Sequence, residues 1–429
     1  LKPVFAKKIL NEYFFIKDSS FFVYIFYIIN YLLICIAIAK LSNIVYHKNM
    51  IIHRSLEKNL LKSIKKNSVL FITGPRQSGK TTLVRNLFKD YLYKNLENPE
   101  IRLFAYSDPK NFLNQSSKLV IDEIQRVPEL LSYIQSIVDE DKRKKFVITG
   151  SQNLLISQKI SQSLAGRVAI FNLLPFTLQE LKKTNSYKKD LYKQIFFGFY
   201  PRLYDRNLDP LEWYPNYIQT YLERDVREIK NIANLIDFQR FLKLCAGRVG
   251  QILDLSSLAN DVGISVNTAK SWLSVLEATF ILYRLPPFYK SFNKRIIKSP
   301  KIYFYDTGLV CSLLAIKTKD QLKSHPLFGN IFENFCISEV VKQNYHLNLN
   351  LQFYYFRNKS GNEVDLIYER NNQIYAIEIK SAATFLESFL KNLDYLEKIS
   401  GNKIQKIIIY SGLNNNQFKD VLIQSWKNI

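Results

Sequence analysis

The stretch VLFITGPRQSGKTTL, residues 69 to 83, constrains the fold of this chain more than any other segment. VLFIT is typical of a short buried strand, and the spacing of Leu83, Leu87 and Phe88 predicts a helix. The glycine-rich loop between them fits the pattern G-x-x-x-x-G-K-[ST], in which backbone N–H groups and a helix N-terminus face an anion. The order strand, loop and helix therefore predicts an α/β domain that holds phosphate groups.

The whole loop is a candidate nucleotide-binding site for ATP. Lys80 supplies a point charge to the β- and γ-phosphates and is also a candidate catalytic residue, while Thr81 supplies a hydroxyl group to Mg²⁺. ATP and Mg²⁺ are thus the expected cofactors. The other candidate ligands lie in the loop or at the start of the helix: Gly74, Pro75, Arg76, Gln77, Ser78, Gly79 and Thr82.

Two later strands are predicted to complete this site. KLVIDEIQ, residues 118 to 125, ends a strand in Asp122, which we expect to hold Mg²⁺ and nucleotide, and Glu123, which we expect to polarise the attacking water. KFVITGSQN ends the next strand with Ser151, a candidate sensor of the γ-phosphate. Farther on, Arg167 in SLAGRV is a candidate arginine finger; the alternative is a surface or interdomain salt bridge.

A second candidate site lies in EVDLIYERNNQIYAIEIKS, residues 363 to 381. The alternation of side chains predicts two strands, and Asn371 and Asn372 tolerate the positive φ of a two-residue hairpin turn. Counting outward from that turn places Asp365 opposite Glu378.

Two carboxylates in opposed positions lie roughly 5 Å apart and repel each other unless a positive charge lies between them. A divalent cation would supply that charge, and Lys380 on the same face would orient a water molecule or stabilise developing charge. The alternative is a solvated strand face on which Glu363 and Lys380 form a surface salt bridge.

Composition places only loose limits on the fold and function of the chain. A length of 429 residues suggests about three domains, and 47% hydrophobic residues indicate folded cores. The four scattered cysteines, including Cys35, have no metal-ligand spacing, so we expect reduced, buried thiols in a cytoplasmic protein. The net charge of +23 permits DNA binding without implying it, because the lysines are spread over the whole chain.

The first 49 residues contain an apolar run at positions 21 to 39 that is long enough to cross a bilayer. The only methionine is Met50, just before the predicted nucleotide-binding domain. We expect residues 1 to 49 not to be native and translation to start at Met50. The alternative is a genuine membrane anchor, and a membrane is an expected partner only in that case.

The middle of the chain is predicted to be helical. Residues 186 to 240 fit a helical lid, and residues 253 to 288 have the pattern of a helix-turn-helix followed by a β wing. The side chains that could face a DNA groove are few, so packing against protein is the alternative. Residues 325 to 343 predict a helix with Glu333 on its polar face.

Several motifs together carry a family resemblance. GPRQSGKTTL, LVIDEIQRVPELL, ITGSQNLLI, SLAGRV and LPFTLQEL resemble the ATP-binding core of a bacterial and archaeal family of AAA-type ATPases with a C-terminal domain of unknown function. GFYPRLYD, YLERDV and YFYDTGL extend the resemblance, which runs from about Met50 to Ala383. The end of such chains resembles the restriction-endonuclease-like fold, which implies that Glu333, Asp365 and Glu378 bind metal and that Lys380 aids attack.

We therefore expect an α/β protein that has a P-loop AAA-type ATPase core at 50–185, a helical lid at 186–240, a winged-helix domain at 241–300 and a restriction-endonuclease-like α/β domain at 301–429. The expected function is Mg²⁺-dependent ATP hydrolysis coupled to DNA binding or processing, with double-stranded DNA and a second copy of the chain as candidate partners. The alternative is a nucleotide-controlled switch or scaffold whose end domain only binds a partner.

Overall fold

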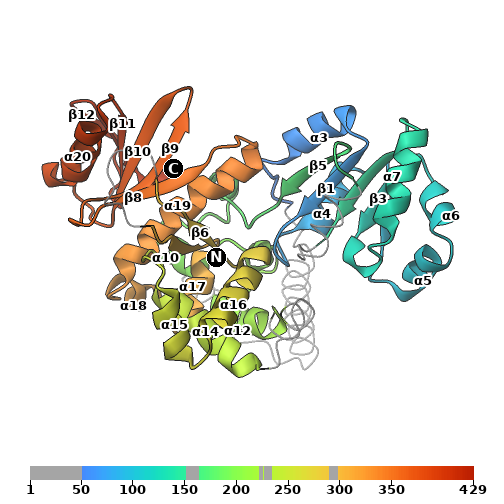
Figure 1. Ribbon diagram of the computed structural model, residues 1–429, viewed down its shortest axis with the longest axis horizontal. Helices are drawn as coiled ribbons and strands as arrows, with labels where there is room; N and C mark the ends of the chain where they lie inside the picture. Colours follow the sequence, from blue (N-terminus) through green and yellow to red (C-terminus); the bar gives the residue numbers. More distant parts are fainter. Residues whose placement is uncertain (1–50, 151–163, 222–225, 227–233, 289–297) are drawn as a thin grey trace, which may run out of the picture. The chain divides into compact units, whose positions relative to one another are not determined.

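The computed structural model describes residues 51–150, 164–221, 226, 234–288 and 298–429 (Figure 1). The predictions for residues 1–49, for Cys35 and for Ser151 lie outside these ranges. Within them, no helix is both long and apolar enough to span a bilayer. Three cysteines are described, and all three are buried and free, as expected: Cys245, Cys311 and Cys336.

The nucleotide-binding domain is built on a parallel five-stranded sheet with the strand order β2-β3-β4-β1-β5. Its strands are β1 (Val69–Thr73), β2 (Leu92–Asn95), β3 (Lys118–Asp122), β4 (Lys145–Thr149) and β5 (Val168–Asn172). In β1 all five residues are buried, and alternate residues enter different apolar cores: Val69 and Phe71 one core, Leu70 and Ile72 the other. A strand covered on both faces is apolar throughout, which explains the run VLFIT.

Helices cover both faces of this sheet. One core includes residues of α3 (Glu57–Lys66) and α4 (Lys80–Leu87), and the other includes residues of α5, α6 and α7. These last three helices span Pro99–Ser107, Pro109–Asn114 and Leu130–Glu140, and a short 3-10 helix, η1, spans Ile124–Arg126. The predicted strands and the predicted helix after the loop are confirmed.

The middle region is helical where it is described. Its helices are α9 (Leu178–Lys182), α10 (Leu191–Phe197), α11 (Pro201–Asp205), α12 (Pro210–Tyr221), α14 (Leu235–Gly247), α15 (Leu255–Val262), α16 (Val266–Ala278), α17 (Thr307–Leu313) and α18 (Lys319–Lys323). The strand β6 (Leu282–Leu285) pairs with β7 (Lys301–Phe304). The expected domain boundary at residue 300 therefore falls between two paired strands.

The C-terminal domain has a mixed six-stranded sheet in the order β12-β13-β11-β10-β9-β8. Its strands are β8 (Phe353–Arg357), β9 (Glu363–Arg370), β10 (Gln373–Lys380), β11 (Gln405–Tyr410), β12 (Asn416–Phe418) and β13 (Val421–Ser425). The helix α20 (Lys391–Ser400) shares an apolar core with this sheet, next to the short helix η3 (Glu387–Leu390); η4 (Trp426–Asn428) ends the chain.

The predicted hairpin between β9 and β10 is confirmed. Asn371 and Asn372 have φ of 52° and 62°, and Arg370 pairs with Gln373. The antiparallel pairing continues to Leu366 and Ile377, one position before the two acids.

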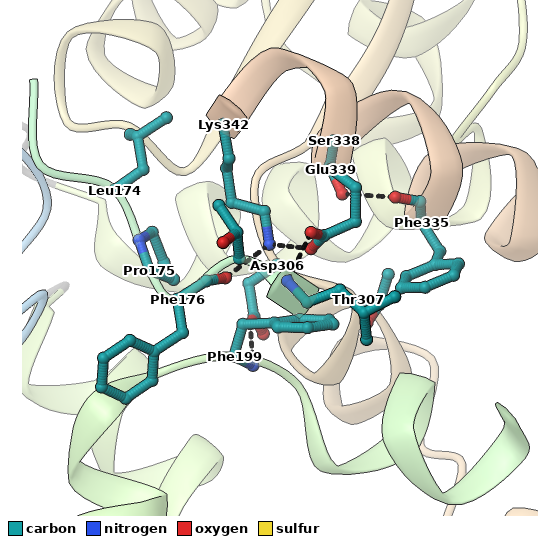
Figure 2. A network of polar contacts seen from close by, with 12 residues as sticks. Leu174, Pro175, Phe176, Phe199, Asp306, Thr307, Phe335, Ser338, Glu339 and Lys342 are labelled. Atoms are coloured by element: carbon teal, nitrogen blue, oxygen red, sulfur yellow. Dashed lines mark hydrogen bonds and ion pairs between the residues drawn. The ribbon is translucent and has the colours of Figure 1, made fainter. Parts of the chain in front are cut away.

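The 20-residue helix α19 (Phe328–Leu347) joins the C-terminal domain to the segment that leaves β5. Three buried ionisable side chains of α19 bond to alternating backbone groups of that segment. Glu339 accepts the N–H of Leu178 at 2.6 Å, Lys342 donates to the carbonyl of Phe176 at 2.8 Å, and His346 Nε2 accepts the N–H of Leu174 at 3.1 Å. Figure 2 shows Lys342 and Glu339 directed toward each other, and they form a fully buried ion pair. These contacts give the motif LPFTLQEL a structural role, because buried backbone groups need partners.

Two other sequence motifs, GFYPRLYD and YFYDTGL, meet at Asp306, which is the N-cap of α17. Its buried carboxylate accepts the N–H groups of Phe199 and Leu309 at 2.7 and 2.8 Å and the Tyr214 hydroxyl at 2.6 Å, and the first contact is drawn in Figure 2. Gly198 leaves room for this arrangement: a Cβ there would lie 1.9 Å from the Tyr214 hydroxyl oxygen and 2.8 Å from an Asp306 oxygen.

We predict that Gly198→Ala lowers the melting temperature much more than Gly263→Ala. Both glycines have positive φ, 74° and 85°, but nothing lies within 4 Å of a Cβ at Gly263. The control therefore carries only backbone strain of about 1 kcal/mol, whereas Gly198→Ala adds steric overlap with two buried polar groups. Thermal melts of both variants measure the difference, and equal losses would contradict the proposed packing role.

Candidate nucleotide site and acidic cluster

The phosphate-binding loop lies between the end of β1 and the start of α4. Gly74 has φ of 148°, and a Cβ on it would lie 2.1 Å from the carbonyl oxygen of Leu173, so only glycine fits. Gln77 and Gly79 also have positive φ, 60° and 93°. Such left-handed positions turn the N–H groups of a loop toward one point, which suits an anion.

Lys80 lies inside this loop and is 6% exposed. Its ammonium group donates to the carbonyl oxygens of Gly74 and Pro75 at 3.0 and 2.9 Å. These two carbonyl groups are neutral, so a phosphate group can replace them at a gain in electrostatic energy. The Ser78 hydroxyl is buried and has no hydrogen-bond partner among the described residues. The loop therefore fits a bound polyphosphate.

The remaining candidates of the loop differ in accessibility. Pro75 and Ser78 are buried, Arg76 is partly exposed, and Gln77 and Thr82 are exposed. Their backbone positions, more than their side chains, shape the loop.

Asp122, at the carboxyl end of β3, is 1% exposed and lies next to the loop. Its Oδ2 accepts the Thr81 hydroxyl at 2.8 Å and the Tyr93 hydroxyl at 2.6 Å, and its Oδ1 accepts the Thr149 hydroxyl. The predicted Mg²⁺ ligands Thr81 and Asp122 are thus in direct contact. An oxygen pair of this kind, beside the phosphate loop, fits a hydrated Mg²⁺ ion.

Tyr93 is a residue of this site that sequence reasoning missed. Burial, together with its hydrogen bond to Asp122, raises the pKa of the Tyr93 phenol, so the phenol stays a donor. Only the pairing of β2 with β3 brings it there, and its sequence neighbourhood carries no signal.

Glu123 has a left-handed backbone with φ of 61°, and its N–H lies 3.4 Å from the Thr149 hydroxyl. Its carboxylate accepts a hydrogen bond from Gln125. A non-glycine residue with this φ next to a predicted catalytic centre is typical of strained functional positions. The prediction that Glu123 polarises water stays a prediction.

Arg167 lies at the surface and forms a bidentate ion pair with Asp139 of α7. Its Nε and Nη2 donate to the two carboxylate oxygens at 2.6 and 2.9 Å. The salt bridge that sequence analysis held as the alternative is therefore present. A role for Arg167 as an arginine finger stays a prediction, and it would require this pair to open.

Arg54 is a second residue that the sequence did not reveal. Its buried guanidinium donates to the carbonyl of Ser78 in the phosphate loop at 2.9 Å and to the carbonyl of Leu174 at 2.5 Å. It also forms an ion pair with Glu180 at 3.1 Å. The Arg54 side chain thus links the phosphate loop to the segment after β5 that α19 contacts.

Glu180 continues this connection to α19. It accepts the N–H groups of Ser55 and Thr177 at 2.7 and 3.0 Å, and its Oε1 lies 3.3 Å from Nδ1 of His346. Burial by itself would raise the pKa of Glu180, but Arg54 and His346 outweigh it and hold that pKa below its ordinary value. The phosphate loop is therefore connected to α19 through the charged pair of Arg54 and Glu180, whose carboxylate lies beside His346.

The two strand acids of the second candidate site are buried, so the alternative of a solvated strand face is wrong. Asp365 is 7% exposed and Glu378 is 2% exposed. The alternative ion pair between Glu363 and Lys380 is replaced by others: Glu363 contacts Arg357 and Lys301, and Lys380 contacts Glu378 at 2.6 Å.

Among the described residues, three acids come together so that one oxygen of each lies within 4.8 Å of the others: Glu333 of α19 and Glu363 and Asp365 of β9. We call these three the acidic cluster. Glu378 of β10, which the sequence placed in the metal site, bonds to Lys380 and to Asn392, the latter at 3.2 Å. Asp365 accepts the N–H of Ile379 at 2.7 Å, which joins β9 to β10 at this point.

Lys301, the first residue of β7, also reaches the acidic cluster. Its ammonium lies 2.9 Å from Glu333 and forms an ion pair with Glu363. Burial raises the pKa of Asp365 well above its ordinary value, as do Glu378 and Glu333, and it also raises the pKa of Glu378. Several carboxylates this close together are costly unless cations neutralise them.

Comparison with known proteins divides the chain into three matched segments. Residues 66–182 match a family model described as AAA domain, residues 188–320 match a domain of unknown function, DUF8612, and residues 328–428 match another, DUF4143.

Relatives occur in bacteria and archaea. The protein Rv2008c of Mycobacterium tuberculosis is 31% identical over 339 residues, which cover 78% of this chain and 75% of the relative. MJ1544 of Methanocaldococcus jannaschii is 24% identical, with 89% of each chain covered. Among solved structures, the Walker-type ATPase PABY2304 of Pyrococcus abyssi is 15% identical with a TM-score of 0.42, covering 62% of this chain and 97% of that one.

We predict that His346 makes the stability of the protein fall with pH below about 6.5. Burial lowers the pKa of His346, and Glu180 only partly offsets this effect. Between the lowered folded pKa and the ordinary value the unfolded chain binds more protons, so the free energy of unfolding drops as pH falls through that range. His346→Gln keeps a donor and an acceptor without titrating. Denaturant melts at pH 7.5 and 5.5 should show the larger loss for the wild type, and equal losses would contradict this role.

Proposed function

This chain belongs to the family of AAA-domain proteins that includes Rv2008c of Mycobacterium tuberculosis, and on that basis we propose that it is a Mg²⁺-dependent ATPase. The observation that carries the proposal is the direct contact of Thr81 with Asp122 beside a loop that already holds the Lys80 ammonium. These are the groups that phosphoryl transfer requires, placed at the carboxyl edge of a parallel sheet.

Each residue has a separate task in this proposal. The backbone N–H groups of the loop and the start of α4 bind the phosphates, and Lys80 moves its donors from the loop carbonyls to the β- and γ-oxygens. Thr81 and Asp122 would hold Mg²⁺, which would neutralise the charge that develops on the phosphates. Glu123 orients and polarises the attacking water, with Gln125 fixing its carboxylate.

An arginine finger would act from a second copy of the chain. Arg167 is at the surface and already pairs with a carboxylate, so exchange of Asp139 for a neighbour's phosphate is chemically simple. We therefore propose that a homo-oligomer is the active form, with Arg167 contributed in trans.

We predict that Lys80→Ala weakens ATP binding by at least about 100-fold, because the phosphates lose a charged donor. Glu123→Gln should preserve binding and slow turnover by about 100-fold or more, because it removes the base and keeps the side chain's shape. Fluorescent-nucleotide titration and steady-state phosphate release measure the two effects. Wild-type turnover in Glu123→Gln would remove Glu123 from its assigned role.

Nucleotide state is proposed to act on the C-terminal domain. Support comes from the contacts that run from Ser78 through Arg54 and Glu180 to His346 of α19, the helix that also carries Glu333. Because α19 is a single helix, a shift at the His346 end moves the Glu333 end with it. This linkage supports the proposal of a nucleotide-controlled switch with a partner-binding end domain.

The second candidate function is DNA processing by the C-terminal domain. It is favoured by the arrangement of Glu333 on a helix with Asp365 and Glu378 on neighbouring strands, next to Lys380. This arrangement is similar to a restriction-endonuclease-like site, and helices α15 and α16 would supply the winged-helix contact to double-stranded DNA. Asn267 and Lys270 of α16 are exposed, which suits such a contact.

Cleavage assays separate the two functions. If the domain cuts DNA, linear and supercoiled plasmids should be degraded in Mg²⁺ or Mn²⁺, with a rate that depends on ATP, and Asp365→Asn should abolish cutting. Glu387→Gln is a control at an exposed acid of the same domain. Absence of cutting by the wild-type protein with and without ATP would leave the switch as the function of this domain.

A further inference from the structure

We propose that the acidic cluster of Glu333, Glu363 and Asp365 is a cation site whose resident cation is the ammonium group of Lys301, and that a divalent metal ion competes with Lys301 for the same carboxylates. This exchange of cations takes place in the C-terminal domain, whether or not the chain hydrolyses ATP. It determines what must happen before any metal can act there.

Lys301 is built into this position. It is the first residue of β7, where it pairs with Leu285 of β6 and bridges to Ile252, so its backbone is fixed on both sides. Its side chain is 2% exposed and lies against the ring of Tyr355, with the ammonium 5.6 Å from the ring centroid. A lysine this deeply buried needs compensating negative charge, because the removal of an ammonium ion from water is costly.

The contacts of the ammonium supply that charge. It lies 2.9 Å from Oε1 of Glu333 and contacts Oε1 of Glu363, and these two acids form the cluster with Asp365. The other oxygen of Glu363 is paired with Arg357 at 3.0 Å. Lys301 is thus shared by carboxylates from a helix and a strand, which is how a bound cation would be shared.

A metal ion needs the same oxygens. Mg²⁺ or Mn²⁺ binds carboxylate oxygens at roughly 2.0–2.2 Å, and an ammonium group at hydrogen-bond distance from those oxygens would lie too close to the metal and repel it. Metal and Lys301 are therefore alternatives, and metal binding requires the lysine to withdraw from Glu333 and Glu363.

A second observation is that the neighbouring buried carboxylate of Glu378 is only partly partnered. Glu378 is 2% exposed, and its Oε2 is buried with no hydrogen-bond partner among the described residues. Its other oxygen is held by Lys380 and Asn392. An unpartnered carboxylate oxygen beside Asp365 favours a cation over an empty pocket once Lys301 has left.

Lys342 provides a matched control within the same domain. It is also buried and also ion-paired, but with the single carboxylate of Glu339 and with the carbonyl of Phe176. Removing Lys342 leaves one acid, which is too few ligands for a divalent ion, whereas removing Lys301 leaves three that converge.

The test compares the wild type, Lys301→Met and Lys342→Met in thermal melts without nucleotide, in EDTA and in millimolar Mn²⁺. Both substitutions should lower the melting temperature in EDTA by about 5 °C or more, because each leaves buried acids unpaired. Mn²⁺ should restore most of the loss in Lys301→Met, restore none in Lys342→Met, and raise the wild type by less than about 1 °C. If Lys301→Met folds only when purified with Mn²⁺, added EDTA should unfold it.

Three outcomes would overturn the proposal. A wild-type protein that gains as much from Mn²⁺ as Lys301→Met would show that metal binds beside the lysine. Lys301→Met that stays destabilised in Mn²⁺, or does not fold in it, would show that the acids do not form a cation site. Lys301→Met that is as stable as the wild type in EDTA would show that the acids need no cation.

Discussion

The buried face of α19 is the interaction on which the rest of this structure depends. Glu339, Lys342 and His346 bond to alternate backbone groups of residues 174 to 178, which would otherwise be buried without partners. Because all three are inaccessible, removal of one leaves an orphaned backbone group, and removal of Glu339 or Lys342 also leaves an unbalanced charge. The nucleotide-binding sheet and the C-terminal domain are joined through polar contacts that tolerate little displacement.

Three buried lysines illustrate how the partner decides what a cation can do. Lys80 bonds to neutral carbonyls, which are weak partners that a phosphate can replace. Lys342 has one carboxylate and serves to join two parts of the chain. Lys301 is shared by two carboxylates of a larger acidic cluster, which is the environment of a bound metal. The charge around a buried lysine therefore decides its role. Lys80 can exchange its partners for a ligand, Lys342 has a structural role, and Lys301 competes with a metal ion.

Local patterns predicted a large part of the fold and of the nucleotide site. The loop from Gly74 to Thr81, the strand ending in Asp122 and the hairpin turn at Asn371 and Asn372 were correctly placed, because each depends on neighbours in sequence. The alternative interpretation, a solvated strand face, did not predict that Asp365 and Glu378 are buried. Period-two alternation cannot distinguish a surface from a second core, and the C-terminal sheet packs on both faces.

What the sequence alone determined is the chemistry available: a phosphate loop, a candidate Mg²⁺ ligand pair, and two acids and a lysine on adjacent strands. Only the tertiary structure decided which of these groups meet which others. Arg54 reaches Glu180 across 126 positions of the chain, and Lys301 reaches Glu333 and Glu363 from a strand that the sequence assigned to a domain boundary. Such contacts leave no local periodicity, since they are set by the packing of elements that lie far apart in the sequence.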